Sequence, residues 1–375
     1  MARLGDVCTK AASNIAQKDL EGHDGCYPIY GASGFIKNVD FYQQENPYIA
    51  VVKDGAGIGR IMKLPAKSSV IGTMQYILPN STVDISYLAS AMEHMNLSKY
   101  FTGATIPHIY FKDYQRETLP LPSLDEQRKI AAVLDTVSDL IAKRRQQLDK
   151  LDEMVKARFV ELFGDPVANP RRWPLVPLKE CLTTIENGKS FVCSNESRKN
   201  KWPAILKLSA VTYGKYNANE NKALLDALQF VESAEVHSGD LLFTRKNTPE
   251  LVGMATYVFF SPQKLMMPDL IFRLNTKNNC SKIFLWQLIN HKLFRNNIQN
   301  LASGSAKSMS NISKERLLQL VIYLPPIQLQ NQFAEFVEQT EKTKATISRS
   351  LEKLKTLKKA LMQEYFDKEG GSIVI

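Results

Sequence analysis

One glycine-rich segment has the residue types and the spacing of a cofactor loop. Residues 51–59 read Val-Val-Lys-Asp-Gly-Ala-Gly-Ile-Gly, so that an apolar run enters a Gly-x-Gly-x-Gly pattern. A nucleotide or methyl-donor loop of this kind needs a helix directly after it and an acidic residue about 20 positions further on. Residues 60–65 instead have the pattern of a strand that ends at Pro65, and no aspartate or glutamate lies between Asp54 and Asp84. A glycine-rich turn between strands is the better interpretation.

Other catalytic signatures are missing from the sequence. Asn46-Pro47-Tyr48 lacks the second proline of the Asn/Asp-Pro-Pro-aromatic tetrapeptide of DNA amino-methyltransferases. The five cysteines and five histidines are scattered, without a Cys-x-x-Cys pair, so no metal site is predicted. A nucleophile–histidine constellation leaves no local signature and stays open, although none has a supporting motif. We therefore predict a binding protein that is not an enzyme and needs no cofactor.

The formal net charge of +10 is concentrated in one part of the chain. Residues 170–325 carry 21 lysines and arginines against 11 aspartates and glutamates, whereas residues 1–120 carry 11 of each kind. A basic excess of this size commonly marks a domain that binds a polyanion such as nucleic acid. A generic basic surface is the alternative, and charge alone does not decide between the two.

The cysteines and the start of the chain indicate a compartment. An odd number of cysteines without paired spacing is typical of a reduced, intracellular protein. Residues 1–6 lack the apolar run of a signal peptide. No stretch approaches the ~18 uninterrupted apolar residues of a membrane span. We expect a cytoplasmic protein that does not associate with membranes.

The most informative pattern is a long internal repeat. Residues 109–163 and 312–366 align without a gap at an offset of 203. The unit is too long for a solenoid, whose repeats span roughly 20–50 residues. We expect a duplicated unit, a domain followed by a long helix, which suits a protein with two similar targets. Identical pairs include Pro122/Pro325, Gln127/Gln330, Ala131/Ala334, Leu148/Leu351, Lys150/Lys353, Leu151/Leu354, Lys156/Lys359, Ala157/Ala360, Glu161/Glu364 and Phe163/Phe366.

Four segments follow from the repeat and from the turn signals. We expect a first domain at 1–120, a long helix at 121–165, a second domain at 166–325, and a second long helix with a C-terminal tail at 326–375. Both domains combine short β-like runs with glycine turns and one shorter helix, which gives an α+β fold. The shorter helices are expected at 85–99 and 283–299. Expected strands include Tyr27–Gly31, Tyr48–Val52, Met74–Pro79, Gly239–Arg245 and Met254–Phe260.

Both long helices have the pattern of a coiled coil. Ser123 and Glu126 form a capping-box pattern at the start of the first helix, and Gly164 follows its end. Seam residues are spaced alternately four and three apart. Neither helix can bury its stripe alone, so we expect the two to pack antiparallel, related by an approximate twofold. The first seam is Ile130, Leu134, Val137, Ile141, Arg144, Leu148, Leu151, Val155, Arg158 and Leu162. The second is Phe333, Val337, Thr340, Lys344, Ile347, Leu351, Leu354, Lys358, Leu361 and Tyr365.

Several segments in combination resemble a known family. The entry to the first helix, residues 119–130, reads Leu-Pro-Leu-Pro-Ser-Leu-Asp-Glu-Gln-Arg-Lys-Ile. Its exit, and short elements in both domains, have corresponding places in the same family. The chain resembles the DNA-specificity subunit of type I restriction-modification systems over nearly its whole length. The second helix departs from the pattern, because it enters with Gln328-Leu329-Gln330 instead of an acidic residue and glutamine. The other matching elements are residues 150–154, 162–165, 27–32, 102–103, 109, 239–245, 251–253, 303–304 and 311–313.

The resemblance implies two target recognition domains, each reading one half of a bipartite double-stranded DNA site. The long helices would set the unread spacer and dock two methyltransferase (modification) subunits. A restriction subunit, the motor and nuclease, is an optional further partner. Methylation of adenine, and cleavage where it occurs, would belong to these partners.

DNA-binding candidates follow from the division of labour at such interfaces. Phosphate contacts supply affinity, and base-edge contacts supply sequence. Arg245-Lys246-Asn247 is the preferred group because it follows a predicted strand, where a loop can enter a groove, while Asn247 and Asn311 suit adenine edges. For any one residue, a solvated surface is the alternative. Further candidates of the second domain are Lys189, Arg198, Lys199, Lys201, Lys207 and Lys307. Those of the first domain are Lys53, Arg60, Lys63 and Lys67, with His108 as the weakest.

Two other function classes remain. A coiled-coil adaptor with two protein-binding domains fits the architecture, but the basic second domain argues against it. A catalytic protein such as a fused methyltransferase requires the cofactor loop and the tetrapeptide that the sequence lacks. A DNA-binding assay with the methyltransferase present, and a methyl-donor binding assay, separate these alternatives.

Overall fold

The computed structural model describes residues 1–103, 107–303 and 309–367. Contacts divide the chain into two compact units. Unit 1 consists of residues 1–147 together with the chain from Ile347 onward, and unit 2 consists of Leu148–Thr346. Each unit therefore contains one mixed domain and one half of each long helix.

Unit 1 is built around a four-stranded and a three-stranded sheet of short strands. The four-stranded sheet is antiparallel throughout, and its strand β5 is buried along its whole length, as its Tyr-Ile-Ala-Val-Val sequence favours. In the three-stranded sheet β3 pairs antiparallel with β4 and parallel with β7. The four-stranded order is β2 (Cys8–Ala12), β8 (Met74–Pro79), β5 (Tyr48–Val52), β6 (Ile61–Leu64); the three-stranded order is β4 (Gly34–Val39), β3 (Tyr27–Gly31), β7 (Ser69–Val70); β1 (Ala2–Arg3) pairs with β9 (Thr118–Leu119).

Unit 2 repeats the topology of the four-stranded and three-stranded sheets. Its four-stranded and three-stranded sheets have the same order and the same strand directions as those of unit 1. The orders are β11 (Leu182–Asn187), β18 (Ile271–Thr276), β14 (Leu241–Thr244), β16 (Ala255–Tyr257), and β13 (Asn221–Ala223), β12 (Ala204–Leu206), β17 (Leu265–Met266). The remaining pairs are β10 (Leu175–Pro177) with β20 (Val321–Tyr323), and β15 (Lys246–Asn247) with β19 (Ser310–Asn311). The predicted repeat thus includes the domains as well as the helices.

The shorter helices differ from prediction at their C-terminal ends. Helix α2 (Ile85–His94) stops because Asn96 adopts a left-handed conformation with φ 50°. Helix α6 (Lys282–Asn290) stops because His291 is extended, and α7 (Arg295–Gln299) begins after it. The predicted helices at 85–99 and 283–299 are therefore interrupted. Other short helices are α1 (Leu4–Val7), α3 (Phe111–Tyr114), α5 (Ser209–Thr212) and α8 (Lys314–Leu318).

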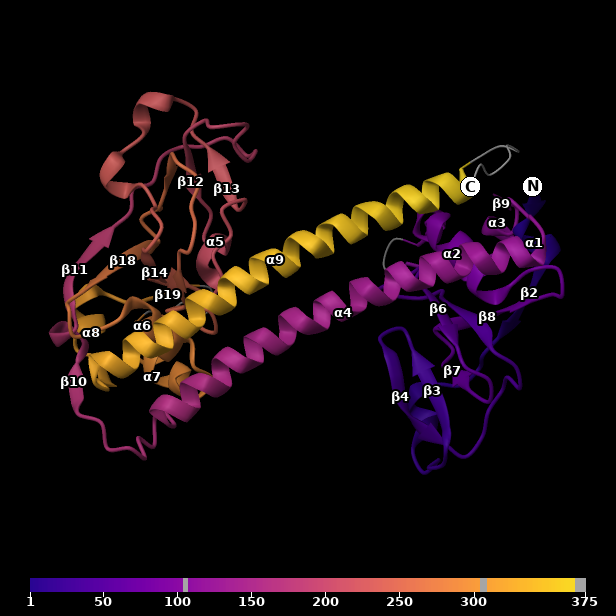
Figure 1. Ribbon diagram of the computed structural model, residues 1–375, viewed down its shortest axis with the longest axis horizontal. Helices are drawn as coiled ribbons and strands as arrows, with labels where there is room; N and C mark the ends of the chain where they lie inside the picture. Colours follow the sequence, from indigo (N-terminus) through magenta and orange to yellow (C-terminus); the bar gives the residue numbers. More distant parts are fainter. Residues whose placement is uncertain (104–106, 304–308, 368–375) are drawn as a thin grey trace. The chain divides into compact units, whose positions relative to one another are not determined.

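The long helices α4 (Leu124–Phe163) and α9 (Ile327–Phe366) are each continuous over 40 residues (Figure 1). In unit 1, Ile130 and Leu134 of α4 share a core with Met362 and Phe366 of α9. In unit 2 the pairing is reversed: the C-terminal part of α4 packs on the N-terminal part of α9. There the shared core contains Phe159 and Phe163 with Phe333 and Val337. The helices are therefore antiparallel, and an offset of 203 converts one set of contacts into the other.

The predicted seam is correct in the first half of α4 and drifts in the second. Phe159 and Phe163 are buried there, each one position after the predicted Arg158 and Leu162. A straight helix of 3.6 residues per turn drifts against a strict 3.5-residue seam. In α9 the same drift buries Met362 and Phe366.

Candidate nucleic-acid interface

The loop that leaves the central strand of unit 2 joins two segments distant in the sequence. The backbone N–H of Ile312 donates to the Arg245 carbonyl at 2.8 Å, which places β19 against the end of β14. Lys246 pairs with Asn311 and Asn247 with Ser310 in the β15–β19 ladder. The loop closes where the N–H of Gly253 donates to the Thr244 carbonyl at 2.8 Å.

Two predicted candidates meet at this loop. The Arg245 Nη2 and Nε groups donate to Asn311 Oδ1 at 3.3 and 3.4 Å, and the guanidinium lies 4.9 Å from the centroid of the Phe272 ring. These contacts hold the planar guanidinium in place while it remains partly exposed. Arg245 and Asn311 are 66 positions apart, so their proximity was not visible in the sequence.

Asn247 is placed differently from its neighbours. Its side chain is buried, Nδ2 donates to Thr212 Oγ1 at 3.1 Å, and Oδ1 accepts from the N–H of Thr248 at 2.9 Å. Both ends of the amide are thus used within the domain. Lys246 is partly exposed beside it.

The remaining candidates of unit 2 divide into occupied and exposed groups. The Arg198 guanidinium donates to the Gln263 carbonyl at 2.7 Å and holds the chain near β17. Lys207 lies 3.7 Å from Glu220, and Lys199 lies 3.8 Å from Glu196 at the surface. The side chains of Lys189 and Lys201 are exposed. Lys307 lies outside the described residues.

The candidates of unit 1 are mostly paired with acids. Lys63 Nζ donates to Ser86 Oγ at 2.7 Å and lies 2.9 Å from Asp135 on α4, so it ties β6 to the long helix. Lys67 lies 3.8 Å from Glu45 at the surface. Arg60 Nη1 donates to the Ala32 carbonyl at 2.7 Å. Each of these three side chains has different partners.

Lys53 and His108 do come together, at Asp54. Lys53 Nζ lies 3.9 Å from Asp54 Oδ2, and His108 Nδ1 contacts Asp54 Oδ1. Burial, and then the charge of Lys53, lower the pKa of His108 below the ordinary value of about 6.5. Since an ionised carboxylate can only accept, Nδ1 is the donor in the contact with Asp54.

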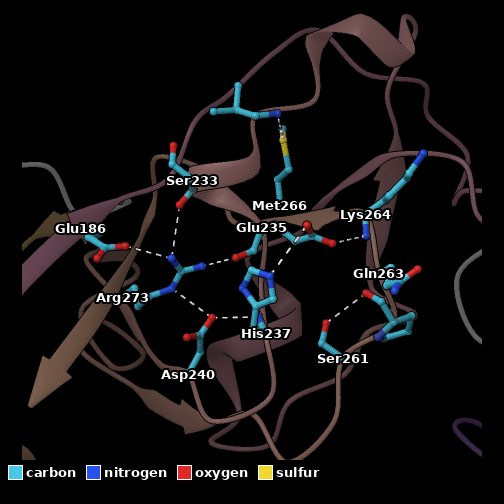
Figure 2. A network of polar contacts seen from close by, with 12 residues as sticks. Glu186, Ser233, Glu235, His237, Asp240, Ser261, Gln263, Lys264, Met266 and Arg273 are labelled. Carbon is cyan, nitrogen blue, oxygen red and sulfur yellow. Dashed lines mark hydrogen bonds and ion pairs between the residues drawn. The ribbon is translucent and has the colours of Figure 1, made fainter.

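A buried arginine network in unit 2 had no signal in the sequence (Figure 2). Arg273 on β18 donates from Nε to Asp240 at 3.0 Å, and from Nη1 to Glu186 at 2.9 Å and to the Ser233 carbonyl at 3.2 Å. It also contacts the Glu235 carbonyl. These bonds join the four-stranded sheet to the segment beside β17. Their evident role is to hold these parts of unit 2 together.

The described part of the chain contains neither a candidate metal site nor a candidate membrane-spanning helix. Over residues 1–103, 107–303 and 309–367, no group of three His, Cys, Asp or Glu side chains is arranged to hold a metal ion. Within the same ranges no helix is long and apolar enough to cross a bilayer.

Sequence comparison decides the family. The chain matches the type I restriction modification DNA specificity domain twice, over residues 1–152 and 170–356. It belongs to this family. The two matches correspond to the two repeats of the fold, so the resemblance seen in the sequence is confirmed. The matched domain is one of DNA specificity, and the relatives are specificity subunits, the non-catalytic recognition component of these complexes.

Relatives agree with this assignment. A specificity subunit of the type I restriction enzyme MjaVIII from Methanocaldococcus jannaschii is 25% identical, over 96% of this chain and 90% of that protein. The EcoEI specificity subunit of Escherichia coli is 31% identical over 53% of this chain, a match that spans 34% of the relative. The crystal structure of the S subunit from M. genitalium has the same fold, with a TM-score of 0.66, 13% identity, and 98% and 96% of the two chains covered.

Proposed function

We propose that this specificity subunit directs a type I methyltransferase to a bipartite DNA site. The domain at 1–120 reads one half of the site and the domain at 166–325 reads the other. The long helices α4 and α9, in the segments 121–165 and 326–375, keep the two domains at a set separation. One observation carries the proposal: the two domains share a strand order but carry different polar side chains on the loop after the central strand. Two domains with the same fold but different side chains on this loop are suited to recognise two different half-sites.

Charge supports a division of roles within the second domain. Lys189, Lys199 and Lys201 are exposed in the basic second domain, where lysines neutralise phosphates. Arg245 and Asn311 offer planar donor and acceptor groups from a fixed position, which suits base edges. Arg198 and Asn247 support the fold, because their polar groups are occupied.

The outer faces of the long helices support docking of methyltransferase subunits. In unit 1, Val133 and Leu140 of α4 are exposed one heptad apart, and Leu357 of α9 is also exposed. In unit 2, Met154 and Val160 of α4 are exposed. Met154 and Leu357 are equivalent at the offset of 203, so each repeat presents one such position. Two methyltransferase subunits, one for each repeat, fit this arrangement, and a restriction subunit is an optional addition.

The direct test uses the complex of this chain with its methyltransferase. Purified complex and methyl donor are incubated with unmethylated genomic DNA, and methyl-adenines are mapped by single-molecule sequencing. We expect a split motif with a constant gap, and no methylation by the chain alone. Methylation at a single continuous motif would contradict the proposal, and failure of the complex to bind DNA would favour the adaptor class.

A further inference from the structure

The loop after β5 in the first domain has an acidic residue, Asp54, at the position where the loop after β14 in the second domain has a basic residue, Lys246. We propose that Asp54 determines specificity in the first domain, by accepting a hydrogen bond from the exocyclic amino group of a cytosine or an adenine in the half-site. The inference rests on the proposed function and adds the chemical class of base that this domain selects.

Backbone hydrogen bonds show that the two loops occupy the same place. In unit 1 the N–H of Ile109 donates to the Lys53 carbonyl at 3.0 Å, as Ile312 donates to Arg245 in unit 2. The N–H of Gly59 donates to the Val52 carbonyl at 2.8 Å, as Gly253 donates to Thr244. The equivalent of Arg245 is therefore Lys53.

The next positions extend the equivalence to the side chains in question. Asp54 forms a bridge with His108, as Lys246 does with Asn311. Thr102 forms a bridge with His108, as Ser303 does with Asn311. Asp54 thus matches Lys246, and His108 matches Asn311. At this position unit 2 has a lysine, beside Arg245, whereas unit 1 has an aspartate.

The Asp54 carboxylate is held in place and is still accessible. Its side chain retains 27% of its exposure, with His108 Nδ1 on one oxygen and Lys53 Nζ 3.9 Å from the other. The His108 ring lies 4.1 Å from the Tyr110 ring. Tyr110 and Phe101, which flank this bridge in the sequence, are 48% and 61% exposed. Large aromatic side chains that remain exposed beside a polar loop are typical of a contact surface.

A hydrogen-bond acceptor at the position of Asp54 selects among the DNA bases. An ionised carboxylate accepts hydrogen bonds and cannot donate them. In the major groove, cytosine N4 and adenine N6 are donors, whereas the O6 and N7 atoms of guanine and the O4 atom of thymine are acceptors. Asp54 therefore favours the amino bases and repels the keto bases. Lys53 offsets the repulsion between the carboxylate and the DNA phosphates.

The test is the Asp54→Asn variant in the complex with the methyltransferase. Asparagine keeps the shape of the side chain and an acceptor for His108, but it also offers an amino donor, so it accommodates keto bases. We expect one position of one half-site to relax, with about tenfold less discrimination against guanine or thymine. The other half-site and the gap should not change. Competition binding with duplexes carrying each base pair at each position measures the same discrimination independently of turnover.

Two further variants sharpen the test. Asp40→Asn is the matched control, because Asp40 accepts from His23 at 2.8 Å in the same domain, outside the loop. We expect its motif to equal that of the wild type. Lys246→Ala, at the equivalent position, should relax only the half-site that Asp54→Asn leaves intact.

The outcomes separate the inference from the proposed function. A wild-type complex without a bipartite motif would refute the proposed function. A bipartite wild-type motif that Asp54→Asn leaves unchanged, in both methylation and competition, would refute the role of Asp54 alone. Equal relaxation by Asp40→Asn would also count against it.

Discussion

Gln127 Oε1 accepts a hydrogen bond from the backbone N–H of Asp84 at 2.8 Å. Asp84 is the N-cap of α2, so a side chain of the long helix binds the start of the shorter helix. Gln330 repeats the contact with Ser281, the N-cap of α6, at 2.8 Å. Both glutamine side chains are fully buried, and their Nε2 groups donate to two carbonyls each. Each glutamine joins one domain to its helix.

Replacing Gln127 with alanine should loosen this joint. The change removes the hydrogen-bond partner of three partly buried main-chain groups, those of Asp84, Thr82 and Pro122, at about 1 kcal/mol for each. We therefore expect unit 1 to lose about 3 kcal/mol in the free energy of unfolding. Amide exchange at Ser86 and Tyr87 should accelerate. Gln146→Ala, at an exposed position of the same helix, is the control; equal exchange in both variants would argue against the joint.

The Arg273 network should contribute more to the stability of unit 2 than the equivalent contacts of Tyr76 contribute to unit 1. Tyr76 on β8 matches Arg273 on β18, and its hydroxyl accepts from the N–H of Val70 at 3.0 Å and donates to Gln43 at 2.8 Å. Arg273→Met leaves the buried Asp240 carboxylate without its ion pair and should cost about 3–5 kcal/mol. Tyr76→Phe should cost about 1 kcal/mol. Urea unfolding measures both.

A control separates this network from a general effect of removing an arginine. Arg316→Met, at an exposed position of α8, should change the free energy of unfolding by less than about 1 kcal/mol. A loss for Arg273→Met no greater than that for Arg316→Met would show that the buried network does not stabilise unit 2.

Salt dependence should distinguish lysines that bind phosphate from cations that support the fold. For the complex with the methyltransferase, the combined Lys189→Ala and Lys201→Ala change should reduce the slope of log K against log salt by about 1.8, at about 0.9 for each lost contact. Arg198→Ala should leave the slope unchanged and lower thermal stability, because its guanidinium binds carbonyls. A reduced slope for Arg198→Ala, together with an unchanged slope for the combined lysine variant, would refute this division.

A lysine–aspartate pair should fix the register of the long helices within unit 2. Lys344 of α9 lies at a seam position, 14% exposed, and contacts Asp152 of α4 at 2.6 Å. Asp152 also accepts from Lys215 at 2.6 Å. Burial raises the pKa of Asp152, but these hydrogen bonds outweigh it and hold that pKa below the ordinary value of 3.8. Asp152→Asn should cost about 1–2 kcal/mol near neutral pH.

The pH dependence of this loss follows from the lowered pKa. A carboxyl group with a lowered pKa in the folded state contributes its full stability above the pKa of the unfolded chain, near 4. That stability disappears as the pH falls through the lower folded-state pKa. The difference between wild type and Asp152→Asn should be constant from about pH 5 to 7 and shrink below about pH 4. Glu153→Gln, at an exposed position of the same helix, is the control, and an equal loss of stability in that variant would argue against a special role of the Lys344–Asp152 pair.

Sequence patterns were informative wherever periodicity determines structure. The alternating seam and the offset of 203 predicted α4, α9 and their antiparallel contacts, and the strands Tyr27–Gly31, Tyr48–Val52 and Met74–Pro79 have the predicted bounds. The drift to Phe159 was missed because the predicted seam kept a strict 3.5-residue period. Gln127 and Gln330 stood out as an identical pair, but their role depends on where α2 and α6 begin.

Site residues were harder to predict because residue type does not reveal the partners of a side chain. Asn247 has the chemistry of a base reader, yet Thr212 and Thr248 occupy its amide. Lys63 has the charge of a phosphate ligand, yet Asp135 occupies it. Asp54 was assigned to a glycine-rich turn, and only the backbone equivalence with Lys246 shows that it stands at the corresponding place.

The central claim is that the paired helices separate two readers of DNA. Its most direct test inserts one, two or three heptads into α4 after Gln147 and into α9 after Thr346, where the two compact units meet along the chain. Each heptad adds about 10.5 Å of helix, or about three base pairs at 3.4 Å each. The account predicts unchanged half-sites and a methylated gap that lengthens in these steps. Methylation should be most efficient in the variant with three inserted heptads, because its gap is longer by close to one turn of the DNA helix. If the gap between the half-sites keeps a constant length although the helices have become longer, the account is contradicted.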